Sequence, residues 1–386
     1  MKRILILIAA FLLLSLPAMA EEIDLSTDGY DNLHNGYCTL PDGRIVMAGG
    51  MAAKGNYQNQ RARLICLNPD GTISWEHVDS APGNCSFSTP VLLADGTIGT
   101  IFRNSPDQSI CQMEIRRFSL EGEPVDTPVD IYVPDMGVCQ SIASCIEYAV
   151  IPPTAQTYYR YFIDWDGNIL FRVFSESSMS GVKDMLSLKD GILLYGTDNG
   201  YPSPAKLLKT DLYGNVQWET VVPTWLDEGD ANLTNGFQTS DGGYVFWLME
   251  NSGNPLGEIT WHTVLVKFDE NGRQVWANHE LSQTVLSSFR NHNCHDILEY
   301  DGKLVVAIGA EDYDENEPHH YLWFSADGEY LGHSVLPVEG RASGSSLTIL
   351  GDVLYDKKVT YIKHEEYMDT QDSFDVKLYP VPLPSY

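Results

Sequence analysis

The sequence predicts an all-β protein built from about seven copies of a repeat close to fifty residues long. Three observations carry this prediction. Asp-Gly turns between apolar runs recur along the chain, a second series of Gly turns alternates with them, and no segment after residue 20 shows a sustained helical periodicity. The composition agrees, because 43% of the 386 residues are apolar and 20% are charged, which is too apolar for a disordered acidic chain.

The first series of turns places an Asp-Gly pair between two apolar runs. Its glycines are Gly43, Gly96, Gly191, Gly242 and Gly302. A two-residue hairpin turn needs positive φ at both central positions, and Asp-Gly tolerates this, so each pair predicts a β-hairpin. The long step between Gly96 and Gly191 spans two repeats, and we place a degenerate copy of the hairpin near Glu147-Tyr148.

The second series ends each turn in a Gly that is often followed, four residues later, by an aromatic residue. Its glycines are Gly71, Gly122, Gly167, Gly214, Gly272 and Gly328, and the aromatic residues are Trp75, Phe171, Trp218 and Trp276. Two interleaved series with one shared period predict two hairpins in each unit, which make a four-stranded antiparallel sheet.

A radial array of such sheets is a β-propeller, and seven units fit residues 21–386 as a single domain. The last unit runs from a hairpin at Leu350–Val353 to a strand at Phe374–Tyr379 and has only three strands. The segment Glu22–Ser26 supplies the missing one. The sequence therefore predicts a seven-bladed β-propeller of four-stranded antiparallel blades, with the ring closed by the mature N-terminal strand.

Residues 1–20 have the pattern of a cleavable secretory signal. Lys2 and Arg3 precede an apolar stretch, Ile4–Leu16, and the small residues Ala18 and Ala20 mark the cleavage site. No Cys follows that site, so a lipid anchor is not indicated, and no later apolar run is long enough to span a membrane. We therefore expect a secreted or extracytoplasmic monomer.

The charge balance excludes two classes of partner. The chain carries 24 Lys and Arg against 53 Asp and Glu, a net charge of −29, which repels nucleic acids and anionic lipid surfaces. A protein or a glycan is the expected partner. The seven cysteines are Cys38, Cys66, Cys85, Cys111, Cys139, Cys145 and Cys294. They are expected to be mainly buried small apolar residues, with at most one or two disulfides among the first six.

The turn patterns resemble those of a known class of repeat. The runs Asp211–Trp218 and Asp269–Trp276, with the Asp-Gly-Gly at 241–243, resemble repeats of bacterial secreted β-propellers and are similar to the pyrroloquinoline-quinone-type propeller repeat. The resemblance spans residues 21–386 and implies a propeller fold. It departs from the quinone repeat in the Asp-to-Gly spacing, and no quinone-binding motif matches residue by residue.

No local catalytic motif is present, because the sequence lacks a G-x-S-x-G, HExxH or P-loop pattern. The alternative is an enzyme that acts on glycans, or a quinone-dependent oxidoreductase, with a site spread over several units. His292 and His295 lack a third metal ligand. Calcium is a weaker alternative at Asp164–Asn168 and at Asp312–Glu317, which lack the Glu that completes an EF-hand loop. We therefore expect no cofactor and no metal.

The axial channel is the predicted ligand site. Residues about seven positions before each hairpin Gly are expected to start the innermost strands and to be polar where the following strands are apolar. Converging polar groups at a propeller mouth favour a ligand site, although solvated loops alone would also be polar. The candidate ligand-binding residues are Asn35, Thr89, Asp184, Asn235, His295 and Asp296. The sequence thus favours a secreted non-catalytic propeller that binds a protein or glycan in this funnel.

Overall fold

The computed structural model describes most of the chain after the N-terminal twenty residues. It covers residues 21–384 except 55, 108–109, 132–136, 142–145, 151–158, 175–180, 198–202, 212–214, 225–228, 254–258, 280, 282–292, 310–317, 338–340 and 363–372. The predicted signal at 1–20 lies outside the described residues. Within the described stretches, no helix has the length and apolarity that crossing a membrane requires.

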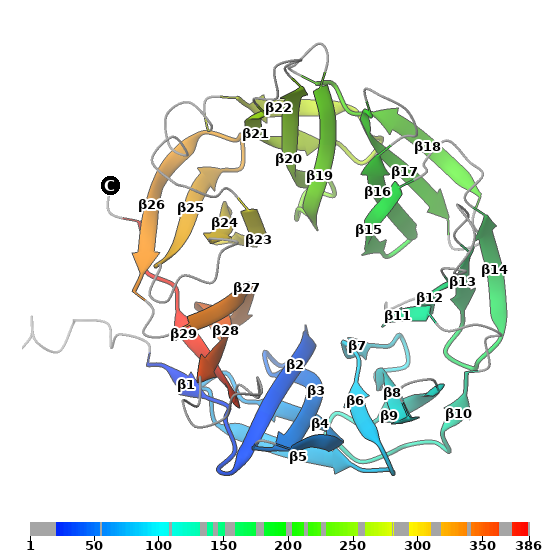
Figure 1. The fold of residues 1–386 in the computed structure, drawn as a ribbon. Helices are drawn as coiled ribbons and strands as arrows, with labels where there is room; N and C mark the ends of the chain where they lie inside the picture. Colours follow the sequence, from blue (N-terminus) through cyan, green and yellow to red (C-terminus); the bar gives the residue numbers. More distant parts are fainter. Residues whose placement is uncertain are drawn as a thin grey trace, which may run out of the picture.

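The fold is all-β and propeller-like. Within the described residues, the strands form six four-stranded sheets and one five-stranded sheet, all antiparallel, which lie around a central axis (Figure 1). We number these sheets 1 to 7 in chain order. This arrangement agrees with the repeat that the two series of turns predict.

The strands of sheets 1 to 3 cover the first half of the chain. Sheet 1 contains β2 (Tyr30–Thr39), β3 (Ile45–Ala53), β4 (Asn56–Leu67) and β5 (Ile73–Asp79). Sheet 2 contains β6 (Asn84–Phe87), β7 (Val91–Leu92), β8 (Ile98–Asp107), β9 (Ile110–Phe118) and β10 (Val129–Asp130). Sheet 3 contains β11 (Gly137–Ser141), β12 (Ile146–Val150), β13 (Tyr159–Ile163) and β14 (Ile169–Phe174).

Sheets 4 to 7 follow the same plan. Sheet 4 contains β15 (Gly181–Leu188), β16 (Gly191–Thr197), β17 (Ala205–Asp211) and β18 (Val216–Val221), and sheet 5 contains β19 (Gly229–Gln238), β20 (Tyr244–Gly253), β21 (Ile259–Phe268) and β22 (Gln274–Asn278). Sheet 6 contains β23 (Asn293–Tyr300), β24 (Lys303–Gly309), β25 (His319–Ser325) and β26 (Tyr330–Leu336). Sheet 7 contains β27 (Arg341–Leu350), β28 (Val353–Ile362), β29 (Ser373–Pro380) and β1 (Ile23–Asp24).

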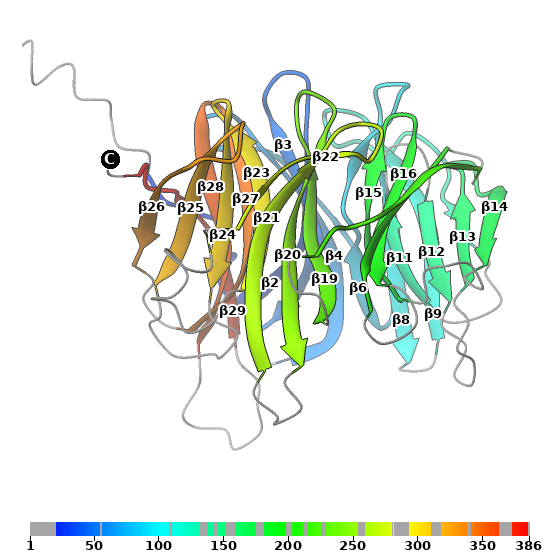
Figure 2. The same cartoon turned by 90° about the horizontal axis from the view of Figure 1, so that it is seen from above.

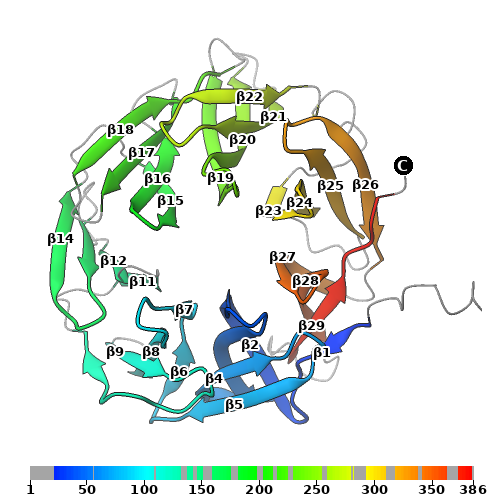
Figure 3. The ribbon, with the colours of Figure 1, turned by 180° about the vertical axis from the view of Figure 1, so that it is seen from behind.

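In sheets 1 to 6 the chain runs from a strand near the axis to a strand on the outside, and in sheet 7 β27 lies near the axis and β1 lies on the outside (Figure 3). Because neighbouring strands are antiparallel, the connections after the first and the third strand of a four-stranded sheet lie at the same end of that sheet (Figure 2); in sheet 7 only the connection from β27 to β28 is of this kind, because β1 comes from the N-terminus. We call this end of the ring the turn face. Both predicted series of Gly turns therefore lie on one face of the molecule.

The hairpin turns differ from the predicted two-residue type at several positions. At Gly43, Gly96 and Gly242, only the Gly has positive φ, at 84°, 84° and 85°. These turns are longer, and a left-handed Gly returns the chain to the second strand. At Asp301-Gly302 both residues have positive φ, 50° and 67°, as the two-residue turn requires.

The degenerate hairpin expected near Glu147-Tyr148 corresponds to the antiparallel pair of β11 and β12. Glu147 and Tyr148 belong to strand β12, and they pair with Gln140 and Cys139 of β11. Residues 142–145, between the two strands, lie outside the described part of the chain.

The core lies between adjacent sheets. Burial in β3 and β24 is almost continuous along the strand, because a middle strand is covered on both faces by the neighbouring sheets. The outer strands β5 and β18 alternate between exposed and half-buried residues. The predicted runs at Tyr244–Met249 and Leu304–Ile308 are buried up to Leu248 and Ile308, which confirms that these apolar segments are middle strands.

The tryptophans of the second series connect neighbouring sheets. The indole N–H of Trp276 donates to the carbonyl of Ala326 in the next sheet at 3.1 Å, and a Cβ on Gly328 would lie 2.7 Å from the Trp276 ring. Trp218 makes the same contacts with Glu270 and Gly272. The Trp of one repeat therefore packs on the turn Gly of the following repeat, not on its own.

Strand β1 is the outer edge of sheet 7. Ile23 and Asp24 pair with Leu378 and Lys377 of β29, and the Leu25 N–H donates to the carbonyl of Val376 at 3.0 Å. Ile23 also contacts the turn of sheet 1, where a Cβ on Gly71 would lie 2.5 Å from it. Ile23 thus occupies the position on Gly71 that Trp276 occupies on Gly328.

Candidate functional site

The innermost strands share a break in regular pairing close to the axis. Register shifts occur in β2 between His34 and Gly36, in β19 between Thr234 and Gly236, and in β23 between Cys294 and Asp296. Strands β15 and β27 shift in the same region, between Val182 and Asp184 and between Ser343 and Ser346. In sheet 2, residues 88–90 separate β6 from β7. The shift leaves one residue without a cross-strand partner in β2, β15, β19 and β23, and two in β27. A β-bulge of this kind redirects the side chain at that position.

The predicted ligand-binding residues lie at or next to these bulges. Asn35, Asn235 and His295 are the bulged residues themselves, and Asp184 and Asp296 each follow one. The expectation that these positions start the strands is wrong, because Asn35 and Asn235 lie inside ten-residue strands, and β15 and β23 begin before Asp184 and His295. Thr89 lies between β6 and β7. The strands extend further than predicted because a bulge interrupts the ladder without ending it.

Several of these polar side chains bond to the neighbouring sheet. The Asn35 amide donates to the carbonyl of Phe87 in sheet 2 at 2.6 Å, and the Asn235 amide donates to the carbonyl of Cys294 in sheet 6. Thr89 donates its hydroxyl proton to the carbonyl of Asn35 at 3.3 Å. These three side chains therefore join innermost strands, a role that sequence reasoning did not assign to them.

The two aspartates join sheets in a related way. Asp184 hydrogen-bonds with the Tyr195 hydroxyl, which also bonds the backbone of Gly236 in sheet 5. The Asp296 carboxylate accepts two backbone N–H groups, each at 2.8 Å. One belongs to Leu347 of sheet 7, and the other belongs to Ile297, the next residue in the chain.

A second side chain reaches Leu347 from the other side. Tyr37 of sheet 1 donates its hydroxyl proton to the carbonyl of Leu347 at 2.6 Å. We call the contact between two neighbouring sheets a seam. Together with the bonds of the Asn and Asp side chains, the Tyr37 bond means that polar side chains bridge five of the described seams near the axis. These seams lie between sheets 1 and 2, 4 and 5, 5 and 6, 6 and 7, and 7 and 1.

Asp296 has the most perturbed carboxyl group of this set. Desolvation raises its pKa from 3.8 to about 7, the two backbone N–H bonds oppose that shift, and the nearby charge of Asp356 adds to it. Part of the Asp296 side chain remains accessible, because its exposure is intermediate. A partly accessible carboxyl group that titrates near neutral pH is a candidate acid or base.

A buried charged cluster lies behind Asp296, between sheets 6 and 7. Asp356 is fully buried and accepts the Tyr321 hydroxyl proton at 2.5 Å. The Lys358 amine and His319 Nδ1 lie 3.8 and 3.6 Å from the same carboxylate oxygen. Desolvation lowers the pKa of Lys358 to about 8, although Asp356 opposes this. Paired charges of this kind hold a seam in one arrangement, and breaking one partner is costly.

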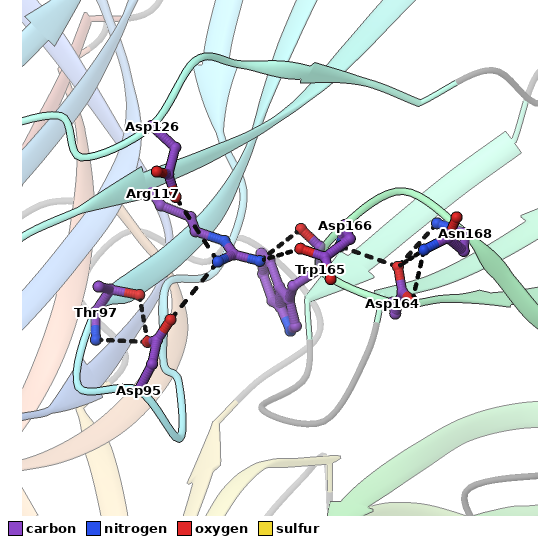
Figure 4. A network of polar contacts seen from close by, with 8 residues as sticks. All are labelled: Asp95, Thr97, Arg117, Asp126, Asp164, Trp165, Asp166 and Asn168. Atoms are coloured by element: carbon purple, nitrogen blue, oxygen red, sulfur yellow. Dashed lines mark hydrogen bonds and ion pairs between the residues drawn. The ribbon is translucent and has the colours of Figure 1, made fainter.

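The calcium alternative at Asp164–Asn168 has another explanation in the structure. The Asp164 carboxylate accepts the backbone N–H groups of Asp166 and Asn168, at 2.9 and 2.8 Å, so it caps its own turn. Figure 4 shows Arg117 in front of this turn, where its guanidinium lies 2.9 Å from Asp166 and 3.6 Å from Asp95. An arginine therefore already balances the carboxylates here.

The other metal candidates fall partly outside the described residues. His292 and the segment Asp312–Glu317 lie there. The His295 ring stacks on His319 with centroids 6.5 Å apart. In the part of the chain that the structure describes, no three His, Cys, Asp or Glu residues gather as metal ligands.

The described cysteines are free thiols. Cys66, Cys85 and Cys294 are buried, and Cys38 is half-buried. Burial raises the pKa of Cys38 to about 12 and that of Cys66 to about 11, so these thiols are protonated at neutral pH. The side chains of Cys111, Cys139 and Cys145 lie outside the description.

The chain matches no protein-family model and no curated protein. Among solved structures, it is similar to a protein of unknown function from Dyadobacter fermentans, with 14% identity, a TM-score of 0.47, and coverage of 94% of this chain and 98% of that one. It is also similar to the periplasmic gluconolactonase PpgL of Pseudomonas aeruginosa, with 11% identity, a TM-score of 0.42, and coverage of 79% and 85%.

Proposed function

We propose that this protein is an extracytoplasmic seven-bladed β-propeller that binds a protein or glycan ligand at the axial end of its innermost strands, without catalysing a reaction. The observation that carries the proposal is the recurrence of bulges at the same level of five innermost strands. Bulges are enriched beside binding and active sites, where they redirect side chains.

The count of seven blades and the closed ring are part of this proposal. Support comes from the pairing of β1 with β29 and from the contact of Ile23 with the turn of sheet 1. Each outer strand with a described Trp makes that contact with the next sheet. The pattern of residues 1–20, which is typical of a secretory signal, supports the extracytoplasmic location.

Asp184 and His295 are the best probes of the axial site. Asp184 is exposed, and His295 is half-buried at its bulge. The test applies the purified protein, without residues 1–20, to an immobilised panel of neutral and acidic oligosaccharides. Asp184→Ala and His295→Ala should each weaken binding by about tenfold, the usual scale for losing a hydrogen bond to a ligand.

Lys189→Ala provides the matched control. Lys189 is exposed on the turn face, far along the strand from the bulge, so its removal should leave binding unchanged. Oligosaccharide binding that survives both axial substitutions contradicts the axial site. If no oligosaccharide binds, and the parent protein captures a protein that the two variants do not capture, the site is assigned to a protein ligand.

Asp296 favours a second candidate function, hydrolysis of a glycan. Its carboxyl group titrates at about pH 7, as a general acid at neutral pH requires. Release of reducing sugar from any of the oligosaccharides, lost in Asp296→Asn, would replace the binding proposal with the catalytic one. Binding without release, retained in Asp296→Asn, favours the binding protein.

A further inference from the structure

A cavity opens between sheets 5 and 6 on the turn face, away from the axial site. Its volume is about 110 Å³, and Asp241, Lys267, Glu299, Leu304 and Ala326 are among the residues that line it. A closed apolar cavity of roughly 150 Å³ holds one benzene ring, so this open cavity is of the size of a single ring.

The walls of the cavity are held in place by hydrogen bonds. Asp241 accepts the Lys267 amine at 2.5 Å and the Thr239 hydroxyl proton at 2.6 Å. Glu299 accepts the N–H and the hydroxyl proton of Ser240, both at 2.7 Å. The turn of sheet 5 is thus fixed to the first strand of sheet 6, and the Lys267 amine has a defined position.

The seam between sheets 4 and 5 contains the same strands and the same lysine and tryptophan pair, although the inner turn of sheet 4 has two residues (189–190) and that of sheet 5 has five (239–243). Lys209 and Lys267 each pair with the Trp of their sheet, Trp218 and Trp276. Lys209 bonds the turn aspartate Asp190 at 3.1 Å, as Lys267 bonds Asp241. The two seams are therefore internal copies of each other and can be compared residue by residue.

The copies differ at the position that faces the lysine from the next sheet. In the seam of sheets 4 and 5 this residue is Tyr244, the partner of Phe268, and its hydroxyl hydrogen-bonds Lys209. In the seam of sheets 5 and 6 it is Leu304, the partner of Phe324. Leucine has no ring and no hydroxyl, so Lys267 lacks the phenol that Lys209 meets.

A second difference widens the opening. The indole of Trp218 bonds the carbonyl of Glu270, and the indole of Trp276 bonds that of Ala326, so these two turn residues are equivalent. Glu270 carries a side chain close enough to act on Tyr244 through its charge. Ala326 is exposed and has only a methyl group there, which leaves the cavity accessible from the turn face.

We propose that this cavity binds a phenolic ring, which takes the place of the missing tyrosine side chain between Leu304 and Lys267. The ring packs on Leu304, and the Lys267 amine donates a hydrogen bond to the phenolic oxygen. The shared chemistry is a 4-hydroxyphenyl group, supplied either by a free small phenol or by a tyrosine of another protein. Neither the axial residues nor their ligand take part.

The test measures binding of 4-methylphenol to the full mature chain by ligand-observed NMR. Toluene is the comparison, because it keeps the ring and the methyl group but has no oxygen that could accept a hydrogen bond from the Lys267 amine. We expect toluene to bind at least about tenfold more weakly, since the hydrogen bond from a charged donor is lost. N-acetyl-tyrosinamide and N-acetyl-phenylalaninamide form the second pair and distinguish a tyrosine side chain from a free phenol.

Three variants locate the site. Leu304→Tyr fills the cavity as Tyr244 fills its copy, and should abolish phenol binding. Ala326→Glu restores the side chain found at Glu270 on an exposed turn, and should weaken binding without affecting the fold. Tyr244→Leu combined with Glu270→Ala reproduces both features beside Lys209, so the number of bound phenols should rise from one to two, whereas Tyr244→Phe should leave it at one.

Specific outcomes overturn the proposal. Equal binding of 4-methylphenol and toluene, no detectable binding of either phenol at millimolar concentration, or binding that is unchanged by both Leu304→Tyr and Ala326→Glu would each do so. Circular dichroism and melting of each variant show that it is folded. If 4-methylphenol binds and N-acetyl-tyrosinamide does not, the site is assigned to free phenols. If both bind, the site also accepts a tyrosine side chain.

Discussion

Asp296 and Leu347 are joined across the seam between sheets 6 and 7, where the Leu347 N–H donates to the Asp296 carboxylate at 2.8 Å. Leu347 also receives the hydroxyl of Tyr37 on its carbonyl, at 2.6 Å. One residue of sheet 7 is therefore held by side chains from the sheets on both sides. These bonds fix the innermost strands around the axis, where few backbone contacts between sheets are possible.

The raised pKa of Asp296 predicts that stability depends on pH. The folded protein keeps a proton on this carboxyl up to about pH 7, whereas an ordinary carboxyl loses it near 3.8. The contribution is complete below pH 3.8 and is lost as the pH rises through 7. Wild type should therefore lose on the order of 2 kcal/mol between pH 5 and pH 8 relative to Asp296→Asn, measured by urea unfolding. Parallel pH profiles would contradict this.

The contact between Trp218 and Gly272 predicts a large effect of a single methyl group. Gly272 has a φ of 76°, and a Cβ there would lie 2.6 Å from the Trp218 ring. Gly272→Ala should cost about 1–2 kcal/mol for the left-handed backbone and a further 1–3 kcal/mol for the clash. Gly96→Ala is the control, because Gly96 has a φ of 84° and nothing within 4 Å. If Gly272→Ala and Gly96→Ala lose the same stability in thermal or urea unfolding, the contact with Trp218 does not contribute to the loss.

The same contact explains how far the sequence predicts the fold. The turn glycines and their spacing predict the repeat and the four-stranded sheets, because φ and strand pairing are local properties. The partner of each Gly is not local. Gly122 and Gly328 look like weak copies because no aromatic follows them, yet Trp75 and Trp276 of the preceding repeats pack on them. Ile23 and Val129 take the same position on Gly71 and Gly167 without being aromatic.

The axial residues show a similar limit. The spacing from the hairpin Gly locates Asn35, Asn235 and His295 at the right level of the strands, and the bulges there are not visible in the sequence. An amide can bind a ligand or bond the neighbouring strand, and only the distance between the two strands decides which. The Lys358–Asp356 pair could not be predicted, because both residues lie in a strand that reads as an ordinary polar run.

The buried pair of Asp356 and Lys358 predicts an asymmetric response to substitution. Asp356→Asn leaves the buried Lys358 amine without its compensating charge, and should cost about 3–5 kcal/mol in urea unfolding. The double variant Asp356→Asn with Lys358→Met removes both charges, and should recover a large part of that loss. A double variant that is as unstable as the sum of the two single variants would show that the charges do not interact.

The contacts of β1 predict that the N-terminal segment is essential for stability. Leu25 is buried, its carbonyl accepts the guanidinium of Arg63 at 3.0 Å, and Ile23 packs on Gly71. Deletion of residues 21–27 exposes the edge of β29, loses roughly 1.5–3 kcal/mol for each apolar side chain, and leaves Arg63 without one acceptor. The melting temperature should fall on the order of 10 °C.

Deletion of residues 21–22 alone is the control. It removes Glu22, an exposed partner of Lys377 at 2.6 Å, and should change the melting temperature by about 1 °C or less. If the longer deletion melts like the parent, β1 does not close the ring.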